Sequence, residues 1–498
     1  MNRFKTYFFR LTIAMFALGL AGSLIPAPRA AEDQPSAQPT TATTSQPATA
    51  AQPATDTQTR LEELEKEVSA LQSEISSLKS DSSPAIKTAA YAQPAPGAAV
   101  FSPDAQAPAT PPAISISSLL GPITLSGFGD VYYGYDYNHP EDNLAGLRSF
   151  EAPTNGFNFN MAELILDKPA DATSAESRLG YHVSAGYGYA AKVINGSDVP
   201  FGSSSGDNFY LKEAYFDYIA PVGKGLTITV GKFVTPMGAE VIESNANWNY
   251  SRGILFDYAI PFFHFGANAK YTFNPKWAVT GYLVNGWNNT VIDHDDTGQS
   301  SGLTYGASVV YTPNAKWTAT ENYFAGPVID AFGSGSKTLN DWKQISDTVI
   351  AYTPNAKWAF QVNGDYAFGP KYYSGSLCSD TVVSFPSTAS CTGGSAINYW
   401  GGAGYLKYTL SPKTNFAVRY EYFDDTDGYA GVLFGYNGWA QEVTGTYSYN
   451  LTSALLIRGE YRYDFAQLPI FSTGSKDVKN QNTATLSFVY TFSSANLK

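Results

Sequence analysis

The chain has few of the residues on which most catalytic and metal centres depend. It contains four histidines and two cysteines in 498 residues. No G-x-S-x-G nucleophile motif and no cluster at metal-ligand spacing is present in the sequence. His294, between Asp293 and Asp295, fits a solvated loop better than a catalytic base. We therefore expect no enzyme, no cofactor and no metal.

Charged residues are scarce, and long apolar runs are confined to the N-terminus. Charged and aromatic residues each make up 15% of the chain, an unusual balance for a soluble protein. The net charge of −12 argues against a nucleic-acid partner. After residue 30 no window is apolar enough for a membrane helix. A chain of this kind can span a membrane only with strands.

Residues 1–30 read as a signal peptide. Basic residues precede an apolar run from Leu11 to Ile25, and small residues follow around Ala27 and Ala31. An uncleaved anchor helix is the alternative, but the apolar run is short for a full span. We expect the mature chain to be exported.

The sequence predicts two flexible linkers, 31–60 and 81–114, on either side of a short helical pattern at 61–80. The linkers are rich in Ala and Pro, which disfavours a packed core. The pattern predicts an α-helical coiled coil that joins copies into a homo-oligomer, a dimer or a trimer. A solvated single helix is the alternative, because three heptads are near the lower limit for a zipper. The a and d positions hold Leu61, Leu64, Val68, Leu71, Ile75 and Leu78.

The region 115–492 alternates apolar with polar or small residues, as a transmembrane β-barrel does. In the last such stretch, Leu486, Phe488 and Tyr490 alternate with Ser487 and Thr491. Seven short turns and eight longer loops predict an all-β antiparallel barrel of about sixteen strands, and a tail at 493–498. Barrels of this size leave an aqueous lumen. The expected strand starts are Ile123, Phe157, Ser177, Asn208, Leu226, His264, Trp277, Leu303, Lys316, Lys343, Lys357, Asn398, Thr414, Trp439, Ser453 and Thr483.

One turn is repeated, as TFNPKW at 272–277 and TPNAKW at 312–317 and 353–358. Pro and Asn favour the turn, and Trp opens the next strand where an interfacial aromatic girdle belongs. Short turns of outer-membrane barrels are periplasmic and long loops extracellular. The coiled coil is joined to the first strand, and we therefore expect it to lie in the periplasm.

Two long loops carry candidate functional residues. Cys378 and Cys391 lie in the loop at about 370–397 and are expected to form a local disulfide, since further metal ligands are absent nearby. The third long loop, about 234–263, is expected to fold inward and narrow a channel, with an outward cap as the alternative. Its charges are Glu240, Glu243, Arg252 and Asp257.

Charged residues on later strands are expected to line the pore, because ionised groups facing lipid are costly. They alternate with Tyr420, Tyr461 and other apolar residues. Pairing across the wall, without a role in selectivity, is the alternative. Both signs are present, so no strong ion preference follows. The expected pore-lining residues are Arg419, Glu421, Arg458, Glu460 and Arg462.

Several segments resemble the outer-membrane β-barrel porin family described as porin-2 or OmpL-like. They are the run SISSLLGPITLSGFGDVYYGYDYNHP from Ser115, GKFVTPMGAE from Gly231, NYSRGILFDYAIPFFHFGANAKY from Asn249 and VNGWNN from Val284. The resemblance implies a channel-forming protein but adds little about its cargo. In two respects the chain departs from the family: six residues follow Phe492, and the coiled coil is an addition.

Three functions remain open on this reading. The first is a porin in the outer-membrane lipid for passive diffusion of small hydrophilic solutes. The second is a channel selective for oligosaccharides or anions. The third is a structural or adhesive barrel tethered by its periplasmic coil.

Overall fold

The computed structural model describes residues 123–195, 208–292, 302–327, 342–369, 398–428, 430, 432–433 and 436–496. The expected signal peptide, linkers, coiled coil and both cysteines lie outside these residues. None of the helices among the described residues is both long and apolar enough to cross a membrane.

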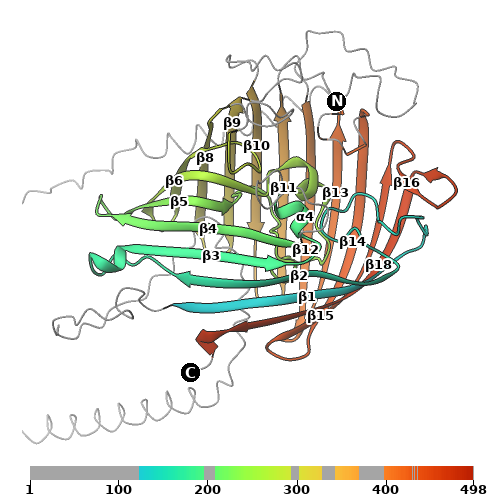
Figure 1. Ribbon diagram of the computed structural model, residues 1–498, viewed down its shortest axis with the longest axis horizontal. Coiled ribbons are helices and arrows are strands. Elements are labelled where there is room, and N and C mark those ends of the chain that lie inside the picture. The colour runs from blue at the N-terminus through green and yellow to red at the C-terminus, as the bar shows by residue number, and fades with distance from the viewer. Residues whose placement is uncertain are drawn as a thin grey trace, which may run out of the picture. The chain divides into compact units, whose positions relative to one another are not determined.

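Sixteen antiparallel strands of the described residues form one closed ring (Figure 1). Strands that follow each other in the chain pair with each other, and β1 pairs with β18 to close the ring, Ser126 opposite Ser493. The prediction of an antiparallel barrel of about sixteen strands is confirmed. The ring contains β1 (Thr124–Asp136), β2 (Gly156–Lys168), β3 (Leu179–Tyr187), β4 (Phe209–Ala220), β5 (Leu226–Val234), β6 (Phe263–Asn274), β7 (Trp277–Val284), β8 (Thr304–Asn314), β9 (Trp317–Pro327), β10 (Trp342–Tyr352), β11 (Trp358–Phe368), β12 (Asn398–Ser411), β13 (Thr414–Asp425), β14 (Gly438–Asn450), β15 (Leu455–Ala466) and β18 (Asn480–Ser493).

Successive side chains of a strand point to opposite faces, and the two faces of this wall differ in chemistry. On β13, Val418 and Tyr420 are 44% and 46% exposed. Arg419 and Glu421, which alternate with them along the strand, are fully buried. On β18, Leu486 and Tyr490 are exposed and Ser487 is buried. On these strands the outer face is therefore apolar and aromatic, and the inner face of β13 carries the ionisable residues.

The repeated turns owe their shape to one local hydrogen bond. In each copy the Asn side-chain oxygen accepts from the backbone N–H of the Lys two residues later, at 2.9 Å. The Trp that follows begins the next strand and packs against a Tyr of a neighbouring strand, as Trp317 does on Tyr352 with ring centroids 4.0 Å apart. The three turns use Asn274 and Lys276, Asn314 and Lys316, and Asn355 and Lys357.

A few short elements were not predicted. The loop between β15 and β18 contains a small hairpin of β16 (Phe471–Ser472) and β17 (Asp477–Val478). The helix α4 (Ala191–Ile194) follows β3, and a π-helical turn, η3 (Leu255–Ala259), precedes β6. Such elements are too short to give a periodic sequence signal.

Candidate functional site

The segment 235–262, between β5 and β6, contacts inner-face residues on widely separated strands. We call it the β5–β6 segment. Its Pro236 carbonyl accepts from Asn322 on β9 at 3.0 Å, and its Ala239 N–H donates to Asn363 on β11 at 2.9 Å. The Ser244 hydroxyl donates to Asp130 on β1 at 2.8 Å. The Asn249 side chain donates to Thr446 on β14 at 2.8 Å. The segment is therefore bonded to the wall on several sides of the ring.

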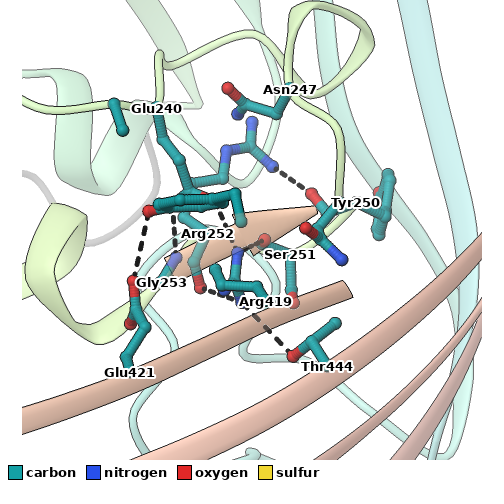
Figure 2. A network of polar contacts seen from close by, with 12 residues as sticks. Glu240, Asn247, Tyr250, Ser251, Arg252, Gly253, Arg419, Glu421 and Thr444 are labelled. Atoms are coloured by element: carbon teal, nitrogen blue, oxygen red, sulfur yellow. Dashed lines mark hydrogen bonds and ion pairs between the residues drawn. The ribbon is translucent and has the colours of Figure 1, made fainter. Parts of the chain in front are cut away.

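Arg419 of β13 is the centre of this network (Figure 2). Its guanidinium forms ion pairs with Glu240 of the segment at 2.5 Å and with Glu442 of β14 at 2.6 Å. It also donates to the backbone carbonyls of Ser251 at 2.6 Å and Arg252 at 3.3 Å. A guanidinium has five N–H donors and no acceptor, so it can satisfy several buried acceptors at once.

Two wall carboxylates bind backbone N–H groups of the same segment. Glu460 of β15 accepts from Tyr250 at 2.6 Å and from Ser251 at 3.0 Å. Glu421 of β13 accepts from Ile254, and it lies directly against Gly253 in Figure 2. A Cβ at Gly253 would overlap the Glu421 carboxylate. Glycine is thus required by the close approach of the backbone to the wall.

Two arginines of β15 bind backbone carbonyls of the segment. Arg458 donates to Asn247 at 2.8 Å, and Arg462 donates to Arg252 at 2.5 Å. Arg462 also pairs with Asp464 of its own strand at 2.8 Å. Together with the carboxylates, these side chains compensate backbone groups that would otherwise be buried without partners.

The four charges expected in the third long loop are all buried, and each has partners of its own. Glu240, Glu243, Arg252 and Asp257 are all less than 9% exposed. Glu243 pairs with Lys212 of β4, which also binds Glu163 of β2 at 2.6 Å. Arg252 pairs with Glu151, and Asp257 accepts from the Ser149 N–H at 3.0 Å. Burial, followed by the nearby Glu151 carboxylate, raises the pKa of Asp257 to about 7.

The loop 137–155, between β1 and β2, was not singled out from the sequence, yet it completes this network. Arg148 binds Asp464 of β15 through two bonds, at 2.8 and 3.1 Å. Phe150 packs against Phe256 and Phe262, with ring centroids 5.9 and 5.5 Å away. The partners are distant in sequence, so no local spacing could have identified them.

The five residues expected to line a water-filled pore all lie on the inner face, but they are buried. Each is less than 7% exposed. The reason is physical: their charged groups are already bonded to the β5–β6 segment or to neighbouring strands, which cover them. The residues are Arg419, Glu421, Arg458, Glu460 and Arg462.

Comparisons with known proteins agree with the barrel. A protein-family model described as "Putative beta-barrel porin-2, OmpL-like" matches residues 122–492. Comparison with curated protein sequences gave no match.

Solved structures of outer-membrane proteins are also similar. A loop L8 deletion mutant of OmpT from Vibrio cholerae is 11% identical, with 74% of this chain and 99% of that chain covered and a TM-score of 0.46. Pseudomonas putida OprB at high pH is 13% identical, with 74% and 94% covered and a TM-score of 0.43. An in-vitro folded, trimeric form of the Vibrio cholerae OmpT is 11% identical, with 74% and 99% covered and a TM-score of 0.42.

Proposed function

Because the chain belongs to the β-barrel porin-2, OmpL-like family, we propose that it forms a water-filled outer-membrane channel for passive diffusion of small hydrophilic solutes. The observation that carries the proposal is a closed ring of sixteen strands with an apolar outer face and an ionisable inner face. A barrel of this size is too wide for its wall side chains alone to fill.

The channel is narrowed by the β5–β6 segment, which corresponds to the third extracellular loop of the predicted topology. Support comes from its bonds to inner-face residues of β1, β9, β11, β13, β14 and β15. In this arrangement the buried charges of the segment fix its position, because each is neutralised by a partner or held by a backbone donor. Ion preference is then weak, since paired charges of both signs largely cancel.

Planar-bilayer recording tests the channel directly. Refolded protein that shows a heat-dependent shift in gel mobility should give stable steps of conductance, with weak voltage dependence and little or mild cation preference. Folded protein without conductance would refute the channel. The triple variant E240Q, E243Q and D257N should change step size and noise more than reversal potential, because E240Q and E243Q remove two ion pairs that hold the segment.

A structural or adhesive barrel is the second candidate, and one observation favours it. Apolar side chains from the 137–155 loop and the β5–β6 segment form a buried cluster with inner-face residues of the wall; Phe150, Phe256, Phe128 and Phe423 belong to it. Such a cluster can occlude a barrel. Absence of conductance, combined with binding of cells or matrix by the folded protein, would support this candidate over the channel.

A saccharide-selective channel is the third candidate. Trp248 of the β5–β6 segment is only partly buried, and its ring lies 6.5 Å from that of Tyr405. Aromatic faces of this kind suit stacking on sugars. A maltooligosaccharide that blocks conductance in a concentration-dependent way, with the block lost in W248A, would favour a saccharide-selective channel. Conductance that the sugar does not change would favour a general diffusion channel.

The periplasmic coil and the oligomer follow from the sequence pattern at 61–80. The proposed channel is a homo-oligomer whose copies are joined in part by this coil. Cross-linking of the exported protein with and without residues 61–79 tests the idea. An unchanged oligomer after the deletion would show that the coil does not hold the copies together.

A further inference from the structure

Three acceptor side chains form a row across the inner face of β9, β10 and β11. Asp347 lies directly opposite Asn322 on one side and Asp365 on the other. All three are buried, with exposures of 0% for Asn322 and Asp347 and 1% for Asp365. Directly opposed residues of antiparallel strands have Cβ atoms about 5 Å apart. The two carboxyl groups therefore face the same small volume.

The row has more acceptors than donors. The Asp347 carboxylate accepts from Asn322 at 2.7 Å and from Asn363 at 2.8 Å. In contrast, no donor among the described residues reaches the Asp365 carboxyl or the side-chain oxygen of Asn322, and the group that the Asp365 carboxyl meets is the Asp347 carboxyl. Neither aspartate forms an ion pair within that part of the chain. A buried carboxylate without compensation is costly, so a positive charge or a proton is required.

The beginning of the β5–β6 segment adds a further oxygen. The Pro236 carbonyl accepts from the same Asn322 amide that binds Asp347, at 3.0 Å, and the next residues are held by Asn363 through Ala239. Carboxylate, amide and backbone carbonyl oxygens together are the ligands that Ca²⁺ prefers. No group of three or more His, Cys, Asp or Glu suited to a metal occurs in the described residues, and this row has two acids completed by neutral oxygens.

We propose that Asp347, Asp365, Asn322 and the Pro236 carbonyl form a Ca²⁺ site that fastens the start of the β5–β6 segment to the wall. From the sequence we expect no metal, and no local spacing points to this site, because the four groups come from three strands and one loop. The ion would supply the positive charge that the two carboxylates lack. The Asn322 amide, whose N–H group donates to Asp347 and Pro236, would turn over so that its oxygen faces the ion. Water molecules would complete its coordination, which for Ca²⁺ requires six to eight oxygens.

The test uses the mature full chain, refolded in detergent without lipopolysaccharide, because lipopolysaccharide itself binds Ca²⁺. After dialysis against EDTA, CaCl₂ is titrated by isothermal calorimetry, and the thermal midpoint is followed by circular dichroism. We expect saturable binding of Ca²⁺ and a higher midpoint. D365N should weaken binding by on the order of tenfold or more and abolish the shift, because ligand charge sets Ca²⁺ affinity. D347N provides the same test if D365N does not fold.

E321Q is the matched control. Glu321 adjoins Asn322 in the chain but lies on the opposite face of the wall, where its carboxylate accepts from Ser346 at 2.7 Å and Thr348 at 2.5 Å. The E321Q variant should bind Ca²⁺ as the wild type does. The proposal is overturned if the wild type binds no Ca²⁺, or if E321Q loses binding as D365N does. A wild type without Ca²⁺ binding and a D365N variant of higher midpoint would show instead that the two aspartates share a proton.

Discussion

Arg419 of β13 and Glu240 of the β5–β6 segment form an ion pair of 2.5 Å, although they are 179 residues apart and both are buried. Buried pairs add little net stability, but loss of one partner leaves the other charge uncompensated. Here the uncompensated charge would lie at the contact that joins the segment to the wall. The pair therefore couples the position of the segment to the wall.

Replacement of Arg419 tests this coupling. R419M should lower the free energy of unfolding by about 3–5 kcal/mol, since Glu240 loses its ion-pair partner, Glu442 keeps only Arg462 at 3.5 Å, and two backbone carbonyls lose a donor. Thermal unfolding in detergent measures the loss, and bilayer recording should show larger or noisier conductance steps.

A second variant separates lost charge compensation from lost packing. In E240Q/R419M one of the uncompensated carboxylates is neutral, so the double variant should be more stable than the sum of the single changes predicts. K413M, at an exposed turn position, should leave stability unchanged. Equal stability of R419M and K413M would contradict the proposal that Arg419 holds the β5–β6 segment against the wall.

Gly253 is the point of closest approach between segment and wall. G253A places a Cβ against the Glu421 carboxylate, which is held by Ile254 and by Tyr405. We expect a loss of about 1–3 kcal/mol, typical of overpacking. G459A on β15 is the matched control, because no atom lies within 4 Å of the position of its Cβ. Thermal midpoints of the two variants measure the difference, and similar midpoints would refute the close approach.

Asp257 gives the stability a dependence on pH. Burial and Glu151 raise its pKa to about 7, so the folded protein favours the protonated form more than the unfolded chain does. The resulting stabilisation is complete below about pH 4 and is lost as pH rises towards 7, with a change on the order of 4 kcal/mol at most. D257N should flatten this part of the profile, measured by denaturant unfolding at several pH values. The exposed Glu141 is the control: E141Q should retain the wild-type profile.

Cys378 and Cys391 should be joined in the exported protein. A thiol assay under denaturing conditions should detect no free thiol before reduction and two per chain afterwards. Free thiols in protein isolated from the membrane without reductant would exclude the disulfide. A loss of reactivity that is reversed by a chelator would point to a metal instead.

The wall could be predicted because its signals are local. An alternating stretch and an Asn-containing turn can each be recognised within about ten residues of sequence. The strand expected near Lys316, for example, begins at Trp317. The charged residues of the third long loop could also be found from their position. Their partners could not: Arg148 and Asp464, for example, are 316 residues apart, and only the closed ring brings them together. The row of Asn322, Asp347 and Asp365 was hidden for the same reason.

The pairing of β1 with β18 also sets the timing of assembly. Ser126 meets Ser493, so the first and last strands of the barrel cannot join until both ends of the region 124–493 are present. Until then both strands present free edges, which are prone to pair with other chains. A product truncated before residue 480 would lack the closing strand altogether. We expect periplasmic proteases to degrade such a product, because its sheet remains open. The pairing of β1 with β18 would then distinguish complete barrels from incomplete ones.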